Sequence, residues 1–262
     1  MILSKKYNTT VVRFVLFLTM TGAVACGPEK LRNTAIEGKK IAINGDLMAT
    51  QAIDDYIKPY REHVDKDLDS VLAYSPETLD KGKSIGGWQT TIGNLMADVT
   101  FEKADKVFMA REQRHVDVCL LNHGGIRSVI AKGNVTTRTA FEIMPFENSL
   151  VVVALKGEQL VEIANHIAKE KKPHPLAGMQ IHLNKEGMVT ALTVQGKPVE
   201  AGKIYNVATS DYLSSGGDNM EFFKKGIAIY DLDYKLRNLY IDYFKEIDTL
   251  PVIRTERIIQ DK

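Results

Sequence analysis

The sequence has few cysteines, one tryptophan and almost no net charge, although several classes of protein depend on such features. Its 262 residues include two cysteines and one tryptophan, and its formal net charge is +1. A near-neutral total gives no support to nucleic-acid or acidic-membrane binding, which uses strong positive potential, so we expect no nucleic-acid partner. The six histidines and two cysteines form no evident cluster with metal-ligand spacing, so we predict no metal site and no cofactor in this chain. With 44% hydrophobic and 26% charged residues, an ordinary globular protein is expected.

The one long apolar run near the N-terminus, Phe14 to Met20, is too short to span a bilayer stably. Basic residues precede it and small residues follow it, which is the layout of a secretory signal. The stretch 23–26 (Ala-Val-Ala-Cys) resembles a bacterial lipobox, so we predict a signal peptide over 1–25 and lipidation of Cys26. The alternative is a plain signal peptide cut after Ala25, which leaves an unpaired thiol in an oxidising compartment.

These features predict an exported protein of the bacterial cell envelope, periplasmic or held at the outer membrane by its lipid alone. Cys119 lies in an apolar stretch typical of a buried strand, so no disulfide is expected. We interpret 26–46 as a polar tether and 47–262 as one domain with its core motifs in 91–226.

Hydrophobic spacing predicts a mixed α/β fold, with helices early and hairpins late. A helix is expected over 53–71, with Pro59 kinking or splitting it. The other predicted elements are helices at 91–107, 136–142, 157–169 and 236–247, and strands at 116–121, 150–155, 179–183, 189–194, 204–208 and 226–230.

Two glycine-rich turns stand out at 122–127 (Asn-His-Gly-Gly-Ile-Arg) and 214–218 (Ser-Ser-Gly-Gly-Asp). Paired glycines permit positive φ and let a ligand approach the main chain closely. Each turn follows a predicted buried strand, and open α/β sheets bind ligands at such strand ends. The pattern therefore predicts a binding site.

With these turns, two further motifs resemble the C-terminal domain of the 5'-nucleotidase family, which includes periplasmic UDP-sugar hydrolases and surface ecto-nucleotidases. The further motifs are 91–95 (Thr-Ile-Gly-Asn-Leu) and 144–148 (Met-Pro-Phe-Glu-Asn), and the second turn extends back to Tyr212. The resemblance implies layered sheets with flanking helices, and the helix over 53–71 resembles the family's connecting helix.

The resemblance also implies a substrate site for a nucleoside or nucleotide. Its expected residues are Asn122, Arg127, Phe146, Asn148, Tyr212 and Asp218. The two aromatic rings would stack on both faces of a nucleobase, Asp218 and Asn148 would contact polar groups of the nucleoside, and Asn122 and Arg127 would lie near the ribose and phosphate.

Other interpretations of these residues stay open from the sequence. Phe146 could pack in the core, Asp218 could cap a following helix, and Arg127 could pair with a surface carboxylate. His123 replaces a family glycine and has no assigned role, and the remaining histidines are interpreted as surface or satisfied side chains. Trp88 could belong to an interface, a ligand site or the core.

Two departures from the family pattern affect the expected function. None of the Asp, His and Asn motifs of the family's two-metal phosphatase domain precedes Gly93, so we predict no catalytic residues here. The arginine expected ahead of the helix at Thr91 is absent from 84–89 (Ser-Ile-Gly-Gly-Trp-Gln). Lys81 and Lys83 cannot reproduce its bidentate fork, so phosphate recognition has less support than nucleoside recognition.

Three hypotheses follow. The chain is the substrate-recognition part of a nucleotidase in nucleotide catabolism, acting with a separate metallophosphatase chain that carries the divalent metals. Alternatively, it is a stand-alone lipid-anchored nucleoside or nucleotide binder. The third possibility is a scaffold whose ligand site has decayed.

Overall fold

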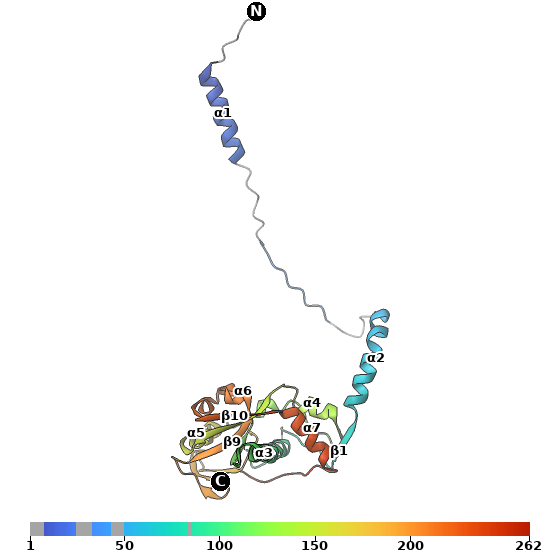
Figure 1. Ribbon diagram of the computed structural model, residues 1–262, viewed down its shortest axis with the longest axis vertical. Helices are drawn as coiled ribbons and strands as arrows, with labels where there is room; N and C mark the ends of the chain where they lie inside the picture. Colours follow the sequence, from blue (N-terminus) through green and yellow to red (C-terminus); the bar gives the residue numbers. More distant parts are fainter. Residues whose placement is uncertain (1–7, 25–32, 43–49, 83–84) are drawn as a thin grey trace, which may run out of the picture. The chain divides into compact units, whose positions relative to one another are not determined.

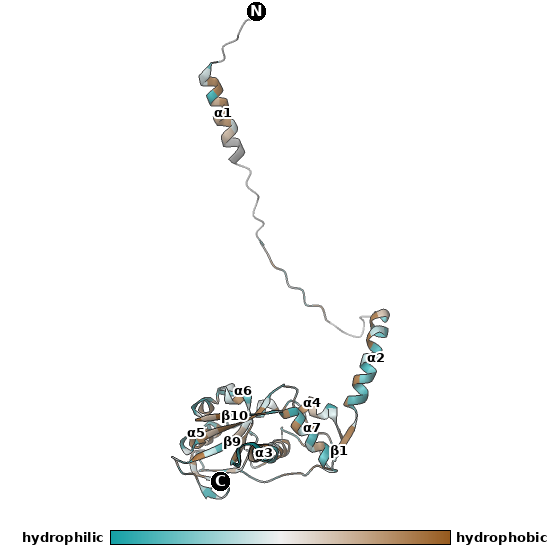
Figure 2. Cartoon of the chain, in the orientation of Figure 1, coloured by the Kyte–Doolittle hydropathy of each residue, from teal (hydrophilic) through white to brown (hydrophobic). Residues whose placement is uncertain are grey.

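The computed structural model describes residues 8–24, 33–42, 50–82 and 85–262. The chain divides into two units, 1–53 and 54–262. In the first unit, residues 9–20 of helix α1 (Thr9–Val24) are largely hydrophobic (Figure 2), and residues 33–42 are exposed without regular structure. No described helix is both long and apolar enough to cross a membrane. Cys26 lies outside the described residues, so its predicted lipidation stays a prediction, as do the bounds of the signal peptide and tether.

Helix α2 (Gln51–Leu68) is shorter than the predicted helix and ends three residues before Val71. It continues through Pro59, so the predicted split does not occur. The chain then forms strand β1 (Val71–Ser75), which pairs antiparallel with β3 (Gly133–Thr136). None of the side chains of α2 is buried, and Ile53, Tyr56 and Tyr60 are exposed.

The second unit is built on a five-stranded mixed sheet with the order β10-β4-β9-β2-β5. Its strands are β2 (Val118–Leu120), β4 (Ser149–Lys156), β5 (Leu176–Ala177), β9 (Ile204–Ser210) and β10 (Ala228–Lys235). A four-stranded sheet has the order β11-β6-β7-β8, from β6 (Met179–Leu183), β7 (Val189–Val194), β8 (Lys197–Pro198) and β11 (Ile258–Gln260). The helices are α3 (Thr91–Glu112), α4 (Thr137–Ile143), α5 (Gly157–Glu170), α6 (Asp211–Ser214) and α7 (Leu236–Glu246). Figure 1 labels β9 and β10 of the five-stranded sheet together with the helices α3 and α5.

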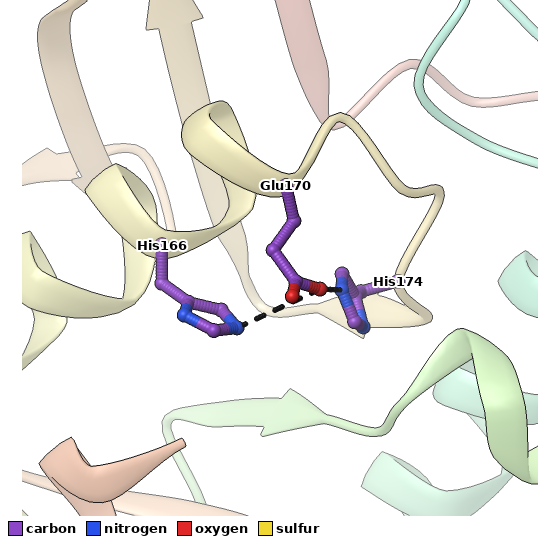
Figure 3. A group of neighbouring side chains, drawn as sticks. All are labelled: His166, Glu170 and His174. Atoms are coloured by element: carbon purple, nitrogen blue, oxygen red, sulfur yellow. Dashed lines mark hydrogen bonds and ion pairs between the residues drawn. The ribbon is translucent and has the colours of Figure 1, made fainter. Parts of the chain in front are cut away.

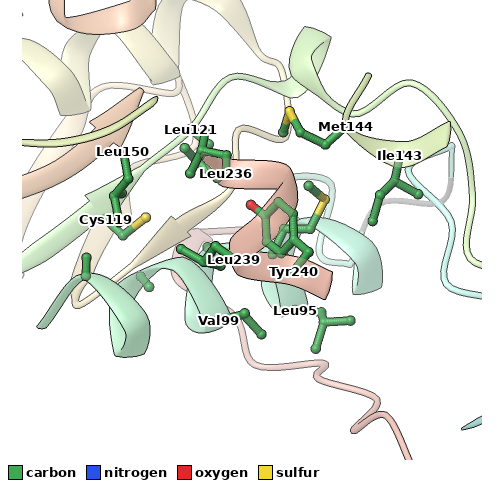
Figure 4. Close-up of a cluster of buried hydrophobic side chains, with 14 of the residues drawn as sticks. Leu95, Val99, Cys119, Leu121, Ile143, Met144, Leu150, Leu236, Leu239 and Tyr240 are labelled. Atoms are coloured by element: carbon green, nitrogen blue, oxygen red, sulfur yellow. The ribbon is translucent and has the colours of Figure 1, made fainter. Parts of the chain in front are cut away.

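Strands β2, β4 and β9 are buried on both faces of the five-stranded sheet. Successive side chains of a strand point to opposite sides of the sheet, so each of these strands contributes to two cores. In β4, Leu150 and Val152 pack with α3 and α7 in one core, which also holds Cys119 and Tyr240 (Figure 4). The alternate residues of β4 pack with α5 in a second core. Continuous apolar sequence is typical of such a doubly covered strand. Buried Cys119 confirms its interpretation, and burial raises the pKa of its thiol.

Both cores lie within the second unit. The buried hydrophobic side chains of the described residues run from Ala73 to Ile258. A fragment comprising residues 50–262 therefore contains both cores together with α2. Because hydrophobic burial is the dominant favourable contribution to folding, we expect this fragment to fold without the residues that precede it.

The motif at the start of α3 has a structural function. The Thr90 side chain accepts a hydrogen bond from the Gly93 amide and caps the helix. Buried Asn94 donates from Nδ2 to the carbonyl oxygens of Ile253 and Thr255, at 3.2 and 3.0 Å. One amide side chain thus ties the first turn of α3 to the C-terminal segment.

Replacing Asn94 with alanine is expected to lower the free energy of unfolding by about 1–3 kcal/mol, because two carbonyls lose their donor in a buried setting. Urea unfolding of the 50–262 fragment measures this change. Asn134→Ala is the comparison, because Asn134 is an exposed asparagine of β3. Equal stability of Asn94→Ala and the parent would show that water replaces the amide without cost.

Candidate functional site

Three segments meet at one edge of the five-stranded sheet. Strands β2 and β9 are parallel neighbours, with Val118 opposite Val207 and Cys119 opposite Ala208. Their carboxyl ends therefore lie side by side and lead into the two glycine-rich turns. Strand β4 runs antiparallel to β9, with Leu150 opposite Ser210, so the segment that precedes β4 reaches the same edge. The topology thus brings together residues that are far apart in sequence.

Asp218 is the centre of the hydrogen bonds at this edge. Its Oδ2 accepts from Asn122 Nδ2 at 2.6 Å, and its Oδ1 accepts from the Tyr212 hydroxyl at 2.9 Å. The backbone amide of Asp218 in turn donates to the hydroxyl oxygen of Tyr212 at 3.2 Å. The carboxylate therefore joins the ends of β2 and β9 and fixes the orientation of the tyrosine ring.

The backbone of the second turn is left-handed at Gly216, with φ of 90°, and at Asp218, with φ of 52°. The helix-cap interpretation of Asp218 is wrong, because the short 3-10 helix η3 (Glu221–Lys225) has Met220 at its N-cap and no side-chain cap. The Asp218 carboxylate points instead to Asn122 and Tyr212. The strained backbone places it there.

On the other side of the site, Arg127 and Phe146 are neighbours. The Arg127 guanidinium carbon lies 5.8 Å from the centroid of the Phe146 ring, and its Nη1 donates to the Gly124 carbonyl at 3.3 Å. Arg127 has no carboxylate partner among the ion pairs of the described residues, which removes the support for its surface-pair interpretation. Phe146 is 41% exposed, so the core interpretation of this ring is also wrong.

All six predicted site residues line one cavity of about 350 Å³, together with Gly124 and Gly125. The ring of Tyr212 is 45% exposed, close to the value for Phe146. Small-molecule sites commonly have volumes of roughly 300–1,000 Å³. The cavity therefore combines two accessible aromatic rings, a guanidinium, two amides and a carboxylate.

Lys81 supports the first glycine turn from outside the cavity. Its Nζ donates to the Ile126 carbonyl at 2.6 Å, and Lys83 lies outside the described residues. Trp88 belongs to the core: it is 5% exposed, and its Nε1 donates to Gln260 Oε1 at 3.2 Å. Neither Lys81 nor Trp88 lines the cavity.

A second hollow of about 310 Å³ adjoins the first and shares Gly124 and Asp218 with it. Close by, His166, Glu170 and His174 offer ligand atoms that all lie within 4.8 Å of one another (Figure 3). The prediction that the histidines form no cluster is therefore wrong, because Glu170 joins His166 and His174 in a group that the spacing of histidines and cysteines alone does not reveal. The spacing His-x₃-Glu-x₃-His places the first two on successive turns of α5 and is the signal that could have found the group.

Burial and hydrogen bonds together determine the charge of this group. It lowers the pKa of both His166 and His174, which favours neutral imidazoles near pH 7. Burial alone would raise the pKa of Glu170, but the hydrogen bonds from Lys172 and His174 lower it below its usual value. The group thus holds two neutral rings and one carboxylate.

Comparison with known proteins identifies the family of this chain. The family model for the 5'-nucleotidase C-terminal domain matches residues 77–225, more than half of the chain. A 5'-nucleotidase of Vibrio parahaemolyticus is 22% identical over 195 residues, which cover 72% of this chain and 33% of the relative. Protein UshA of Salmonella pullorum is 30% identical over 105 residues, covering 39% and 19%. A cell wall protein of Listeria monocytogenes is 26% identical over 189 residues, covering 66% and 23%.

Among solved structures, a 5'-nucleotidase precursor from Thermus thermophilus matches with a TM-score of 0.66 and 23% identity, covering 80% of this chain and 42% of that one. This likeness confirms the predicted mixed α/β fold. The chain spans about a fifth to a third of the length of these curated relatives. Over residues 77–225 the chain belongs to the 5'-nucleotidase C-terminal domain family.

Proposed function

We propose that this chain is the substrate-recognition domain of a 5'-nucleotidase or UDP-sugar hydrolase type of system. The observation that carries the proposal is the convergence of all six predicted residues, from three separate segments, on one cavity. A nucleoside or nucleotide is the ligand whose chemistry matches this lining. It offers an aromatic base, ribose hydroxyls and, in the nucleotide, a phosphate.

Each part of the lining has a partner in such a ligand. Base–aromatic stacking contributes about 1–3 kcal/mol per ring, and the Phe146 and Tyr212 rings are both accessible. The Asp218 carboxylate suits ribose hydroxyls, as acidic residues do in dinucleotide sites. The amides of Asn122 and Asn148 add donors and acceptors, and the Arg127 guanidinium suits a phosphate or paired hydroxyls.

The hydrolytic step is proposed to use a metallophosphatase domain in a separate chain. In this family the C-terminal domain usually pairs with an N-terminal domain of that kind. The metal-ligand motifs Asp-x-His and Gly-Asn-His-Asp or Glu are absent from the 262 residues. We place the divalent metals in the partner and the pair in nucleotide catabolism at the cell envelope, with Cys26 as the lipid anchor of this chain.

Calorimetric titration of the 50–262 fragment with adenosine and then AMP tests the proposal. We expect one ligand per chain without phosphate release, and weaker binding by Asp218→Asn. Tighter binding of AMP than of adenosine would assign the phosphate to Arg127. Absence of heat with either ligand at millimolar concentration would contradict nucleoside recognition by this domain.

If the full chain binds nucleoside, it should also co-purify with a metallophosphatase from the cell envelope of its native organism. Binding without any such partner would instead support a stand-alone nucleoside binder. The two experiments therefore separate recognition from partnership.

A smaller substitution tests how the cavity is shaped. A Cβ added at Gly217 would lie 2.5 Å from Tyr212 Cε1 and 2.6 Å from the Tyr212 carbonyl oxygen, so Gly217→Ala must displace this residue. We expect weaker adenosine binding than in the parent, measured by the same titration. Gly202→Ala is the control, because nothing lies within 4 Å of its added Cβ; equal losses in both variants would refute the local explanation.

A further inference from the structure

The group formed by His166, Glu170 and His174 lies outside the six predicted site residues. His166 and Glu170 project from successive turns at the end of α5, and His174 follows in the loop (Figure 3). The Glu170 Oε2 atom lies 3.1 Å from His174 Nε2 and 3.8 Å from His166 Nε2. The ligand atoms of the three side chains thus all lie within 4.8 Å of one another.

One nitrogen of this group has no hydrogen-bond partner in the part of the chain that the structure describes. His166 Nε2 is buried and makes no hydrogen bond with the described residues. A buried polar atom is normally satisfied by protein or by a bound species. The ring itself is packed edge-on against Phe222, with centroids 5.5 Å apart, so the nitrogen is held in place facing Glu170.

We propose that His166, Glu170 and His174 bind one divalent transition-metal ion, with Zn²⁺ the best fit. Two imidazole nitrogens and one carboxylate oxygen are a ligand set that zinc accepts while keeping a fourth position open. Ligand atoms around a tetrahedral zinc with bonds of roughly 2.0–2.2 Å lie about 3.4 Å apart, between the two distances observed. Nitrogen donors disfavour Mg²⁺ and Ca²⁺, which take oxygen ligands.

The second hollow gives solvent and small ligands access to the open coordination position of the ion. Glu170 and His174 line it, as do His123 and Asp218. A water molecule or an anionic group of a small ligand can therefore reach the ion from the side of the first glycine turn.

Metal binding requires a change of tautomer at His174. In the structure the His123 amide donates to His174 Nδ1 at 3.3 Å, so the ring proton lies on Nε2 and is donated to Glu170. A metal at Nε2 replaces that proton, and the neutral ring then carries its proton on Nδ1. The His123 amide loses its acceptor, so binding of the ion changes the environment of the backbone at the start of the first glycine turn.

The test uses the metal-free 50–262 fragment titrated with Zn²⁺ in competition with a chromophoric chelator. We expect one ion per chain and at least a tenfold loss of affinity in His166→Ala and Glu170→Gln. His115→Ala is the matched control, since His115 also pairs with a carboxylate, Asp105 Oδ1 at 3.0 Å, but is exposed; it should bind as the parent does.

Two further measurements make the test independent of folding defects in one variant. Co²⁺ should give the visible absorption of a tetrahedral site in the parent and lose it in Glu170→Gln. The amide resonance of His123 should shift when Zn²⁺ is added. No zinc binding by the parent, or equal binding by the parent and both ligand variants, would overturn the site.

Discussion

Replacing Tyr212 with alanine is expected to weaken adenosine binding by roughly 5- to 150-fold, the equivalent of about 1–3 kcal/mol for one lost base–aromatic stack. The ring is accessible at the cavity and is held by its hydroxyl on Asp218 Oδ1 at 2.9 Å. Because the ring is fixed before the ligand arrives, little conformational entropy is lost when a base stacks on it. Calorimetric titration of the 50–262 fragment measures the change.

Two comparison variants separate stacking from positioning. Tyr212→Phe keeps the ring but removes the hydrogen bond to Asp218, so its loss of affinity should be smaller than that of the alanine variant. Tyr74→Ala removes a ring of similar exposure, 43%, from strand β1 outside the cavity, and should bind as the parent does. Unchanged affinity in Tyr212→Ala would remove this ring from the site.

A large loss of stability is expected from Gly178→Ala. Gly178 links β5 of one sheet to β6 of the other and has φ of 77°. An added Cβ would lie 2.3 Å from the Asp117 carbonyl oxygen, a backbone atom that cannot move without disturbing the start of β2. Backbone strain and this clash together should lower the free energy of unfolding by about 3 kcal/mol or more.

Thermal unfolding provides the measurement, with a decrease in Tm of roughly 2–4 °C per kcal/mol for a chain of this size. Gly196→Ala is a matched control, because Gly196 also has φ of 77° but nothing lies within 4 Å of its added Cβ. The difference between the two variants isolates the clash. Similar melting temperatures for both variants would mean that the Asp117 carbonyl moves away from the added methyl group at little cost in stability.

The sequence predicted the long, strongly patterned elements well. The strand around Val152 and the helix that follows it were located to within about a residue, because a doubly covered strand and an amphipathic helix have distinct hydrophobic periods. Elements that depend on distant partners were missed. Strands β1 and β3 are short, and they exist because they pair with each other across more than fifty intervening residues. The end of α2 was misplaced for the same reason, since Val71 belongs to that pair.

The candidate site was found through its motifs, whereas its internal contacts could not be predicted. Glycine pairs indicate a turn, but the sequence does not show that Asp218 would accept from both Asn122 and Tyr212. The histidine group was missed because two of its members look like ordinary surface residues on a helix. Only the return of the loop to α5 brings His174 within reach of Glu170.

The parallel pairing of β2 with β9 has a consequence for how the protein folds. The hydrogen bond from Asn122 to Asp218 joins residues 96 positions apart, and contacts of such high sequence separation form late and slowly. A partly folded chain has no complete cavity until this pairing has formed. A ligand that binds only the finished cavity shifts the equilibrium toward the native state by mass action, so its presence during refolding should raise the yield of native protein.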